Sequence, residues 1–437
     1  MSTRRFPVIS ALAGVLWLIG VPGIASSQGN TWAGISLTQM VKAAKWRVGA
    51  LRVNGALEFN NVGYDSDIYY GYFDEPVADF TLAAAMPVQI LLPVGKKIVL
   101  DVFDSPQYIF YLDTKGERSW NNAVKGQVHI AMENFYIQIG GGLSNVRQRL
   151  SPELNLNIRQ KEDRINGTLL WQASQGLSFA LLYGGAKYDY GDAEIEGIPI
   201  AQTLNRNESY VDAITYVQPS SRVRLFLDGQ FGDYFFTEAA SRFKDTRSYG
   251  VFGGLTFIPQ EGKQRPIAPL QGSIRLGYKS FDIIDPLVAD GSGFVGAVDI
   301  SAGMFKRTTC RGFFSQDFSF SAFSTGTFYL STAYGGGLSR QLSRRAILSY
   351  DLTFSRSRYP GTGGEGAPSG RNFRYTTHLA GLHIMLARHV SLSLLATIAT
   401  RTLDQAARKI NRNFFGINLI YGSAPSTVSA PAGGMSR

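Results

Sequence analysis

The chain of 437 residues carries 43 Lys and Arg against 33 Asp and Glu, which gives a formal net charge of +10. The basic residues form no run, so a nucleic-acid partner is not expected. Glycine contributes 48 residues and aromatic residues 12%, yet the mean hydropathy is only -0.04. After the first 27 residues, no apolar run approaches the about 20 residues of a membrane helix. We therefore expect one large all-β unit with alternating apolar and polar residues.

Residues 1–27 are predicted to be a secretory signal peptide. Arg4 and Arg5 precede an apolar run from Val8 to Ile24, and the small residues that follow suit cleavage. An uncleaved membrane anchor is the less favoured alternative, because glycines and prolines interrupt the run. The single cysteine, Cys310, excludes an internal disulfide, so backbone pairing and burial must hold the exported chain together.

The mature chain is expected to have three parts. Residues 28–46 form a periplasmic segment, in which the spacing of apolar residues from Leu37 to Ala44 predicts a short helix. Residues 47–422 form an outer-membrane barrel. Residues 423–437, rich in Ala, Pro, Ser and Gly, are predicted to be a disordered tail.

About eighteen strand-like segments, with sixteen to twenty acceptable, follow one another along the barrel region. Short turns come after the even-numbered segments, at 132–134, 174–176, 219–221, 306–308, 342–344 and 387–389. Longer polar connections come after the odd-numbered segments, at 66–77, 151–160, 189–207, 282–293, 358–371 and 403–409. This alternation predicts a transmembrane antiparallel up-and-down β-barrel, which has tight periplasmic turns and longer external loops.

Charged residues recur on one face of several segments. From Ala346 to Ser355 every second residue is apolar, and Asp351 lies on the opposite, polar face. A dry core would penalise such charges severely, so a hydrated lumen is expected. The candidate pore-lining residues are Arg222, Arg224, Asp228, Arg275, Lys279, Arg311, Asp317 and Asp351. They either pair with one another and brace the wall, or set a field that selects or guides solutes.

Two prolines and three phenylalanines mark further features of these strands. Pro87 and Pro106 each remove a ladder hydrogen bond, which predicts bulges or strand ends at these positions. Phe314, Phe318 and Phe320 alternate with polar residues and are predicted to face lipid.

Four aromatic residues cluster near the end of the first predicted strand: Tyr69, Tyr70, Tyr72 and Phe73. The simplest interpretation is a girdle at the membrane interface. The alternative is that some turn inwards, where they could stack on sugar rings.

No enzyme, metal site or cofactor is predicted. No His, Cys, Asp and Glu cluster has metal-ligand spacing. Gly361–Gly366 matches a dinucleotide fingerprint but lies in a predicted external loop, where it has no strand and helix around it. A serine hydrolase in the barrel wall stays open as a third function, since the chain contains His129, His378 and His383, with His389 predicted in a periplasmic turn.

Three short motifs carry a family resemblance. Val62–Tyr69 resembles the Gly-Tyr-Asp-Ser-Asn-x-Tyr opening of the bacterial outer-membrane family called putative β-barrel porins, second type, with Asp67 where that family usually has Asn. Arg311–Ser321 and Leu338–Arg344 look like the final hairpins of the family. Separately, Phe414–Tyr421 resembles the terminal signal that the barrel assembly machinery reads.

The resemblance implies a barrel of about this strand number that exports a surface polysaccharide or exopolysaccharide, with an export protein of a secretion system as a further partner. The alternative function is a general diffusion porin for small hydrophilic solutes. In either case outer-membrane lipid surrounds the barrel, and the basic residues of its loops are expected to face anionic lipid of the outer leaflet.

Overall fold

The computed structural model describes residues 37–71, 75–149, 156–191, 193–195, 197–258, 270–305, 307–323, 326–359, 372–403 and 408–423. The predicted signal peptide, residues 424–437 of the predicted tail and the Gly361–Gly366 motif lie outside the described residues.

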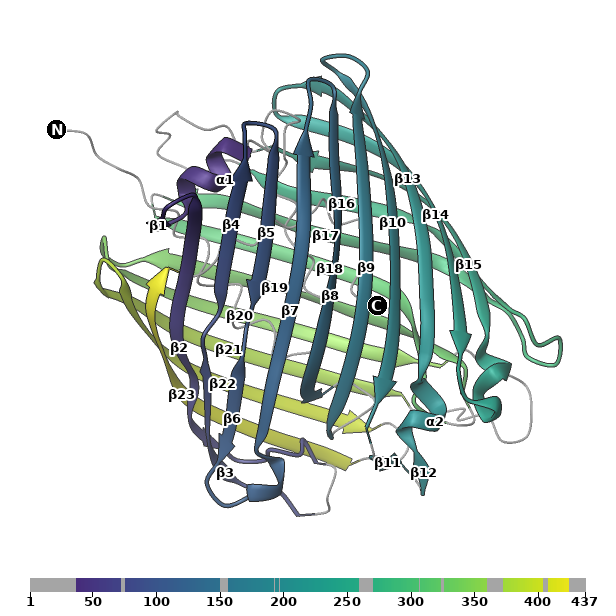
Figure 1. The fold of residues 1–437 in the computed structure, drawn as a ribbon. Coiled ribbons are helices and arrows are strands. Elements are labelled where there is room, and N and C mark those ends of the chain that lie inside the picture. The colour runs from purple at the N-terminus through teal and green to yellow at the C-terminus, as the bar shows by residue number, and fades with distance from the viewer. Residues whose placement is uncertain are drawn as a thin grey trace.

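The described chain forms one antiparallel sheet that closes on itself (Figure 1). Fourteen strands after the first three are continuous: β7 (Ser119–Ala131), β8 (Phe135–Arg149), β9 (Asn157–Gln172), β10 (Leu177–Tyr190), β13 (Arg206–Ser220), β14 (Val223–Phe236), β15 (Thr246–Phe257), β16 (Gln271–Ile283), β17 (Gly291–Phe305), β18 (Thr308–Phe320), β19 (Phe328–Gln341), β20 (Ala346–Arg358), β21 (Phe373–Ala387) and β22 (Val390–Leu403). The last, β23 (Arg408–Ser423), pairs with the first, β2 (Leu51–Asp65), and closes the barrel. Within the described residues this is the expected barrel of eighteen strands.

The second and third strands are each interrupted at a proline. The second consists of β3 (Asp79–Ala85) and β4 (Val88–Val94), which flank Pro87, and the third of β5 (Ile98–Asp104) and β6 (Gln107–Tyr111), which flank Pro106. The predicted strand ends at these two prolines are therefore confirmed. Each proline lacks the amide hydrogen that the ladder would need at its position.

The strands alternate between an outer and an inner face. On β14, Leu227 is 60% exposed, whereas its neighbour Asp228 is 1% exposed. Apolar side chains with high exposure continue around the outside, for example Val251 and Leu276 on the next two strands. An apolar exterior with polar residues inside is the pattern of a barrel embedded in lipid around a hydrated lumen.

Connections at one rim are mostly short and those at the other rim are longer, as the sequence predicts, with one exception. Most joints on the rim where β2 begins and β23 ends are short, so we assign this rim to the periplasm. The connection from β15 to β16, residues 258–270, lies on the same rim and is long. The expectation that every even-numbered segment ends in a short turn is therefore wrong at this position.

Phe318 and Phe320 lie inside the barrel, so their predicted lipid-facing position is wrong. Phe318 packs on Phe281, and Phe320 packs on Tyr234 and Phe281. The pairing of β18 with β17 ends at Gln316. Beyond this point the strand is no longer held in the ladder on that side, and its last residues turn into the lumen.

Three external loops are locked together at the opposite rim. The first contains β11 (Glu194–Ile195), β12 (Ile198–Pro199) and helix α2 (Ile200–Leu204), the second contains the 3-10 helix η5 (Ala239–Lys244), and the third is the connection from β18 to β19. Lys244 is fully buried, and its Nζ donates to the carbonyl oxygens of Thr203, Ser321 and Phe323 at 3.4, 2.9 and 3.0 Å. A buried ammonium held by carbonyls of two other loops fixes all three relative to one another.

A short helix and a small hairpin precede the barrel. Helix α1 (Leu37–Ala43) is followed by β1 (Trp46–Val48), which pairs with the start of β2, and a 3-10 helix η4 (Lys115–Glu117) lies in an external loop. Figure 1 shows α1 at the rim opposite to α2. In the described part of the chain, the helices are too short or too polar to cross a membrane.

Candidate functional site in the barrel lumen

Helix α1 lies against an apolar patch of the inner wall at the periplasmic mouth. Its residues Leu37 and Met40 are 4% and 6% exposed. The patch, which we call the α1 patch, consists of Leu91, Val99, Tyr136, Leu170, Ala180, Leu182 and Ile214, from six of the seven strands between β4 and β13. The inner wall elsewhere includes many buried polar side chains, such as Asp228 and Lys279, and helix α1 covers this apolar area. The helix therefore occupies part of the periplasmic mouth.

We expect Met40→Glu to release α1 from the α1 patch and to raise the single-channel conductance. A carboxylate placed against a dry apolar surface costs several kcal/mol unless it is paired. The matched control is Lys42→Glu, because Lys42 lies on the exposed face of the same helix. Conductance in planar bilayers checks this expectation. An unchanged conductance for Met40→Glu would show that α1 does not limit flow through the mouth.

Three ion pairs brace the inner wall between β14 and β18. Arg275 Nη2 donates to Asp228 Oδ2 at 2.6 Å, and Lys279 Nζ donates to Asp317 Oδ1 at 3.1 Å. Arg311 forms a bidentate pair with Asp299, with distances of 2.9 and 2.6 Å. Asp299 is the one partner that the sequence reasoning missed, because it sits alone on a glycine-rich and apolar strand. Five of the predicted residues thus contact opposite charges.

The remaining three candidates differ from one another. Asp351 lies on the inner face of β20 and interacts electrostatically with Arg311. A Cβ on Gly337, which stands between them in the sheet, would lie 2.1 Å from Asp351 Oδ1, so glycine makes room for this approach. Arg224 stacks over Tyr216 near the α1 patch, with 5.5 Å from its Cζ to the ring. Arg222 lies exposed in the turn before β14 and does not line the wall, which corrects its predicted place.

A row of alternating arginine and aromatic side chains lies near the external mouth. Tyr70 stands between Arg412 and Arg149, whose Cζ atoms are 4.1 and 4.4 Å from its ring centre. Tyr375 accepts a hydrogen bond of 2.6 Å from Arg149 Nη2 and lies 5.6 Å from Arg401 Cζ. We call these five residues the arginine–tyrosine row. Asp65 pairs with Arg412 at its end, with a distance of 2.8 Å to Nε.

The arginine–tyrosine row crosses the lumen. Arg149 belongs to β8 and Tyr375 to β21, and on the shorter way around the barrel β22, β23, β2, the β3–β4 strand, the β5–β6 strand and β7 lie between them. Tyr70 adopts a φ of +52°, in the left-handed region that is unfavourable for a bulky side chain. The surrounding contacts must therefore hold this ring in place. Tyr70 faces inwards, so the girdle interpretation does not apply to it, while Tyr72 and Phe73 lie outside the described residues.

The row was not predicted from the sequence. Arg149, Tyr375, Arg401 and Arg412 come from four separate strands, and their contacts depend on barrel closure rather than on local spacing. The only local signal was the aromatic cluster that includes Tyr70. For Tyr70, the geometry favours the alternative interpretation of that cluster, in which the ring turns into the lumen.

Asp67, in the external turn after β2, is 1% exposed. Its Oδ1 accepts a hydrogen bond from the amide of Tyr69 at 3.2 Å, whereas Oδ2 has no hydrogen-bond partner among the described residues. Burial raises the pKa of this carboxyl above its usual value. An asparagine would fit this turn without a charge to desolvate, which agrees with the residue that the resemblance implies here.

The histidines give no complete hydrolytic site in the described residues. His383 Nδ1 lies 3.0 Å from Ser393 Oγ, but no described carboxylate is within bonding distance of this histidine to orient it. His129 is buried between Tyr136 Oη, at 2.8 Å, and Asp101. His389 lies in the turn between β21 and β22. Among the described residues, no three His, Cys, Asp or Glu side chains converge as a metal site.

A closed barrel with an apolar exterior and a charged lumen defines an outer-membrane porin. The chain belongs to the family Putative beta-barrel porin 2, whose model matches residues 119–422. A search of curated proteins gave no match.

Solved structures similar to this chain include proteins of Pseudomonas aeruginosa and Acinetobacter baumannii. OpdK of Pseudomonas aeruginosa has 12% identity and a TM-score of 0.49 over 85% of this chain and 98% of that chain. OccK2 (OpdF) of the same organism, in complex with glucuronate, has 11% identity and a TM-score of 0.49 over the same shares. OccAB2 of Acinetobacter baumannii has 13% identity and a TM-score of 0.48 over 85% of this chain and 97% of that chain.

Proposed function

We propose that this porin is a passive channel through which small anionic solutes diffuse across the outer membrane. The observation that carries the proposal is the arginine–tyrosine row, in which three guanidinium groups lie near the external mouth and Asp65 pairs with one of them, Arg412. Clustered positive charge in a narrow passage raises the local concentration of anions and lowers that of cations. The aromatic rings between the arginines hold the guanidinium groups in position by stacking against them.

Small solutes fit this mouth better than a growing polysaccharide. The hydrogen bond from Arg149 to Tyr375 joins nearly opposite walls, and a polymer would have to break it and keep it broken. The locking of three external loops by Lys244 argues in the same direction. These contacts support the diffusion porin over the polysaccharide exporter that the family resemblance suggested.

Reconstituted full-length protein tests the charge preference. In a liposome swelling assay we expect gluconate to enter faster than glucose, and glucose faster than glucosamine, since the three are similar in size but differ in charge. In planar bilayers under a salt gradient, the reversal potential should show preference for chloride over potassium. Arg149→Gln combined with Arg401→Gln should bring the permeability ratio down severalfold towards one.

The control is Arg344→Gln combined with Arg345→Gln, which removes the same charge from an exposed periplasmic turn. A preference for cations in the natural protein, or a ratio unaffected by the mouth variant, would refute the proposal. In cells, loss of the gene should slow the uptake of small anions and leave surface polysaccharide unchanged. Polysaccharide trapped in the periplasm would establish export instead.

A further inference from the structure

The periplasmic rim carries an arc of exposed positive charge. Four consecutive connections around this rim contribute to it: the turn from β19 to β20, the turn from β21 to β22, the β1–β2 hairpin and the turn from β4 to β5. They are consecutive because β23 pairs with β2, and Figure 1 shows β1 at the same end of the barrel as the turn from β4 to β5. The six residues that we call the basic arc are Arg47, Lys96, Lys97, Arg344, Arg345 and Arg388.

Within the described residues, little negative charge balances the basic arc. Its six side chains are exposed, and none of them forms an ion pair with a described carboxylate. The described periplasmic turns contain one acidic residue, Glu133 in the turn from β7 to β8. Acidic residues are frequent instead in the described external connections, for example Glu75, Asp113 and Asp285. The positive charge of the described connections is thus concentrated on the periplasmic side, and not in the external loops where the sequence led us to expect it.

The positive charge continues from the rim into the periplasmic mouth. Lys42 is exposed on helix α1, whose opposite face covers the inner wall. Lys45 follows the helix, and partial burial together with the nearby charge of Arg388 lowers the pKa of this lysine. Lipid headgroups surround the barrel and reach only its outer circumference, so they do not contact lysines in the mouth. The face that these cations form is therefore directed towards the periplasm.

The spacing of the basic arc favours an extended anionic polymer over a small ligand. Turns of neighbouring hairpins are two strand widths apart, about 10 Å, so the four connections span about 30 Å. An exposed contact between one cation and one carboxylate contributes only about 0–1 kcal/mol, so a small anion would bind weakly. A polymer with carboxylates at regular intervals makes several such contacts at once and gains affinity from their number. A protein partner would be expected to bury an apolar centre, for which charged turns are poorly suited.

Peptidoglycan has this chemistry and lies in the same compartment as the basic arc. It is a polymer of the periplasm, beneath the outer membrane, and its peptides carry free carboxylates along each glycan strand. We propose that the basic arc binds the carboxylates of peptidoglycan and holds the periplasmic rim of the barrel against the cell wall. The basic arc is separate from the arginine–tyrosine row, so this inference does not rest on the proposed transport function.

Cosedimentation of the full-length protein, folded in a non-ionic detergent, with purified peptidoglycan sacculi tests the proposal. The natural protein should sediment with the sacculi, and the bound fraction should fall as salt is added, because the contacts are exposed. Sacculi whose carboxylates have been converted to amides should bind the natural protein much more weakly. Binding should also be at least about tenfold weaker for a variant without the basic arc: Arg47→Gln, Lys96→Gln, Lys97→Gln, Arg344→Gln, Arg345→Gln and Arg388→Gln.

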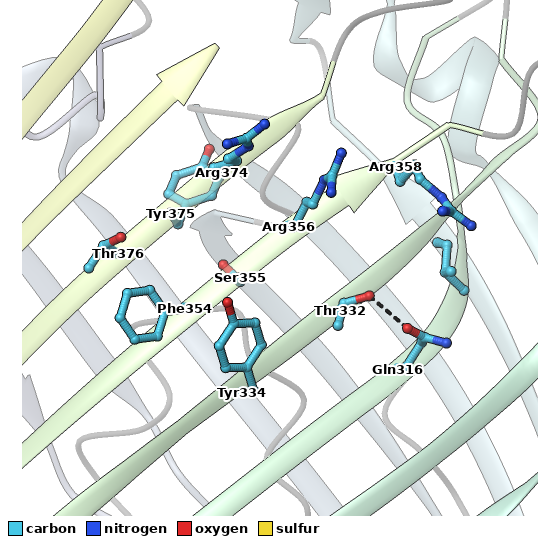
Figure 2. Close-up of a pocket in the computed structure, with 11 residues that line it drawn as sticks. Gln316, Thr332, Tyr334, Phe354, Ser355, Arg356, Arg358, Arg374, Tyr375 and Thr376 are labelled. Atoms are coloured by element: carbon cyan, nitrogen blue, oxygen red, sulfur yellow. Dashed lines mark hydrogen bonds between the residues drawn. The ribbon is translucent and has the colours of Figure 1, made fainter. Parts of the chain in front are cut away.

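The matched control removes six exposed cations from the external half of the barrel and should bind sacculi normally. Two of these cations, Arg356 and Arg358, lie at the external end of β20 beside a pocket of about 660 Å³ (Figure 2). The gel shift on boiling shows that each variant is folded. The full control variant is Lys115→Gln, Lys161→Gln, Arg242→Gln, Arg356→Gln, Arg358→Gln and Lys409→Gln.

Two outcomes would overturn the proposal. Equal binding of sacculi by the natural protein and the variant without the basic arc would mean that these cations are not the contact. The same assay in nanodiscs separates the cell wall from phospholipid headgroups, and binding should be similar in phosphatidylcholine with and without phosphatidylglycerol. If phosphatidylglycerol abolished the binding of sacculi, anionic headgroups would occupy the basic arc and the proposal would be wrong.

Discussion

Replacing Gly63 by valine will prevent closure of the barrel between β2 and β23. Gly63 pairs in register with Gly416 at this seam. A Cβ at position 63 would lie 2.0 Å from the carbonyl oxygen of Phe415 and 2.5 Å from Gly416 Cα. These are backbone atoms of the closing strand and cannot turn away as a flexible side chain can. The strands would have to separate where the sheet becomes continuous.

We expect the loss in free energy of unfolding for Gly63→Val to exceed the about 1–3 kcal/mol of an ordinary overpacked site. The protein should lose the folded band that migrates differently before and after boiling. Gly229→Val is the matched control, since a Cβ at Gly229 meets no atom within 4 Å and the residue is exposed on β14. If Gly63→Val folded as well as Gly229→Val, the tight seam described above would not exist in solution.

The fold could be predicted because each strand and each turn of a barrel has its own pattern in the local sequence. A residue pattern of period two, alternating connection lengths and two strand-breaking prolines each report on one strand or one turn. The segment from Ala346 to Ser355 is an example: Leu348 and Tyr350 face outwards and Asp351 faces inwards, as its alternation predicts. No knowledge of distant strands was needed.

The features that the sequence did not predict correctly share a different cause. Phe318 and Phe320 continue the alternation of their strand, but their ladder on one side ends at Gln316 and the chain bends inwards. Strand pairing is a property of two segments, and the period of one segment does not show where the pairing stops. The arginine–tyrosine row is a stronger case, because Arg149 and Tyr375 are 226 positions apart and meet only across the closed lumen.

Most of the charged residues of the wall were predicted from the sequence, but the pairs that they form were not. Asp228 and Arg275 are on strands separated by β15, and Lys279 and Asp317 are separated by β17. Such pairs reach over the intervening strand, where a glycine stands in register with the cation: Gly254 of β15 beside Arg275, and Gly293 of β17 beside Lys279. The interaction energy between two paired charges decides whether they brace the wall or only shape the field. A double-mutant cycle measures this energy for one pair.

We expect Arg275→Gln to lower the free energy of unfolding by about 3–5 kcal/mol, because it leaves a buried carboxylate without its cation. Asp228 is 1% exposed, and both hydrogen bonds from Arg275, at 3.2 and 2.6 Å, go to its Oδ2. The guanidinium also lies 3.5 Å from the ring centre of Phe252, so the arginine is fixed from two sides. Asp228→Asn should cost a similar amount by leaving the arginine unpaired.

The double variant Asp228→Asn with Arg275→Gln should be more stable than the sum of the two single losses predicts, by at least about 1 kcal/mol, since it leaves no unpaired charge. Urea unfolding in detergent micelles, followed by tryptophan fluorescence, measures all four proteins. The control cycle uses Asp233 and Arg247, whose side chains are 23% and 56% exposed at a distance of 3.4 Å and should couple by only about 0–1 kcal/mol. Equal coupling in the two cycles would mean that water screens the lumen pair as fully as the surface pair. In that case the paired charges would not brace the wall, and their effect on the field experienced by a passing solute would remain as their role.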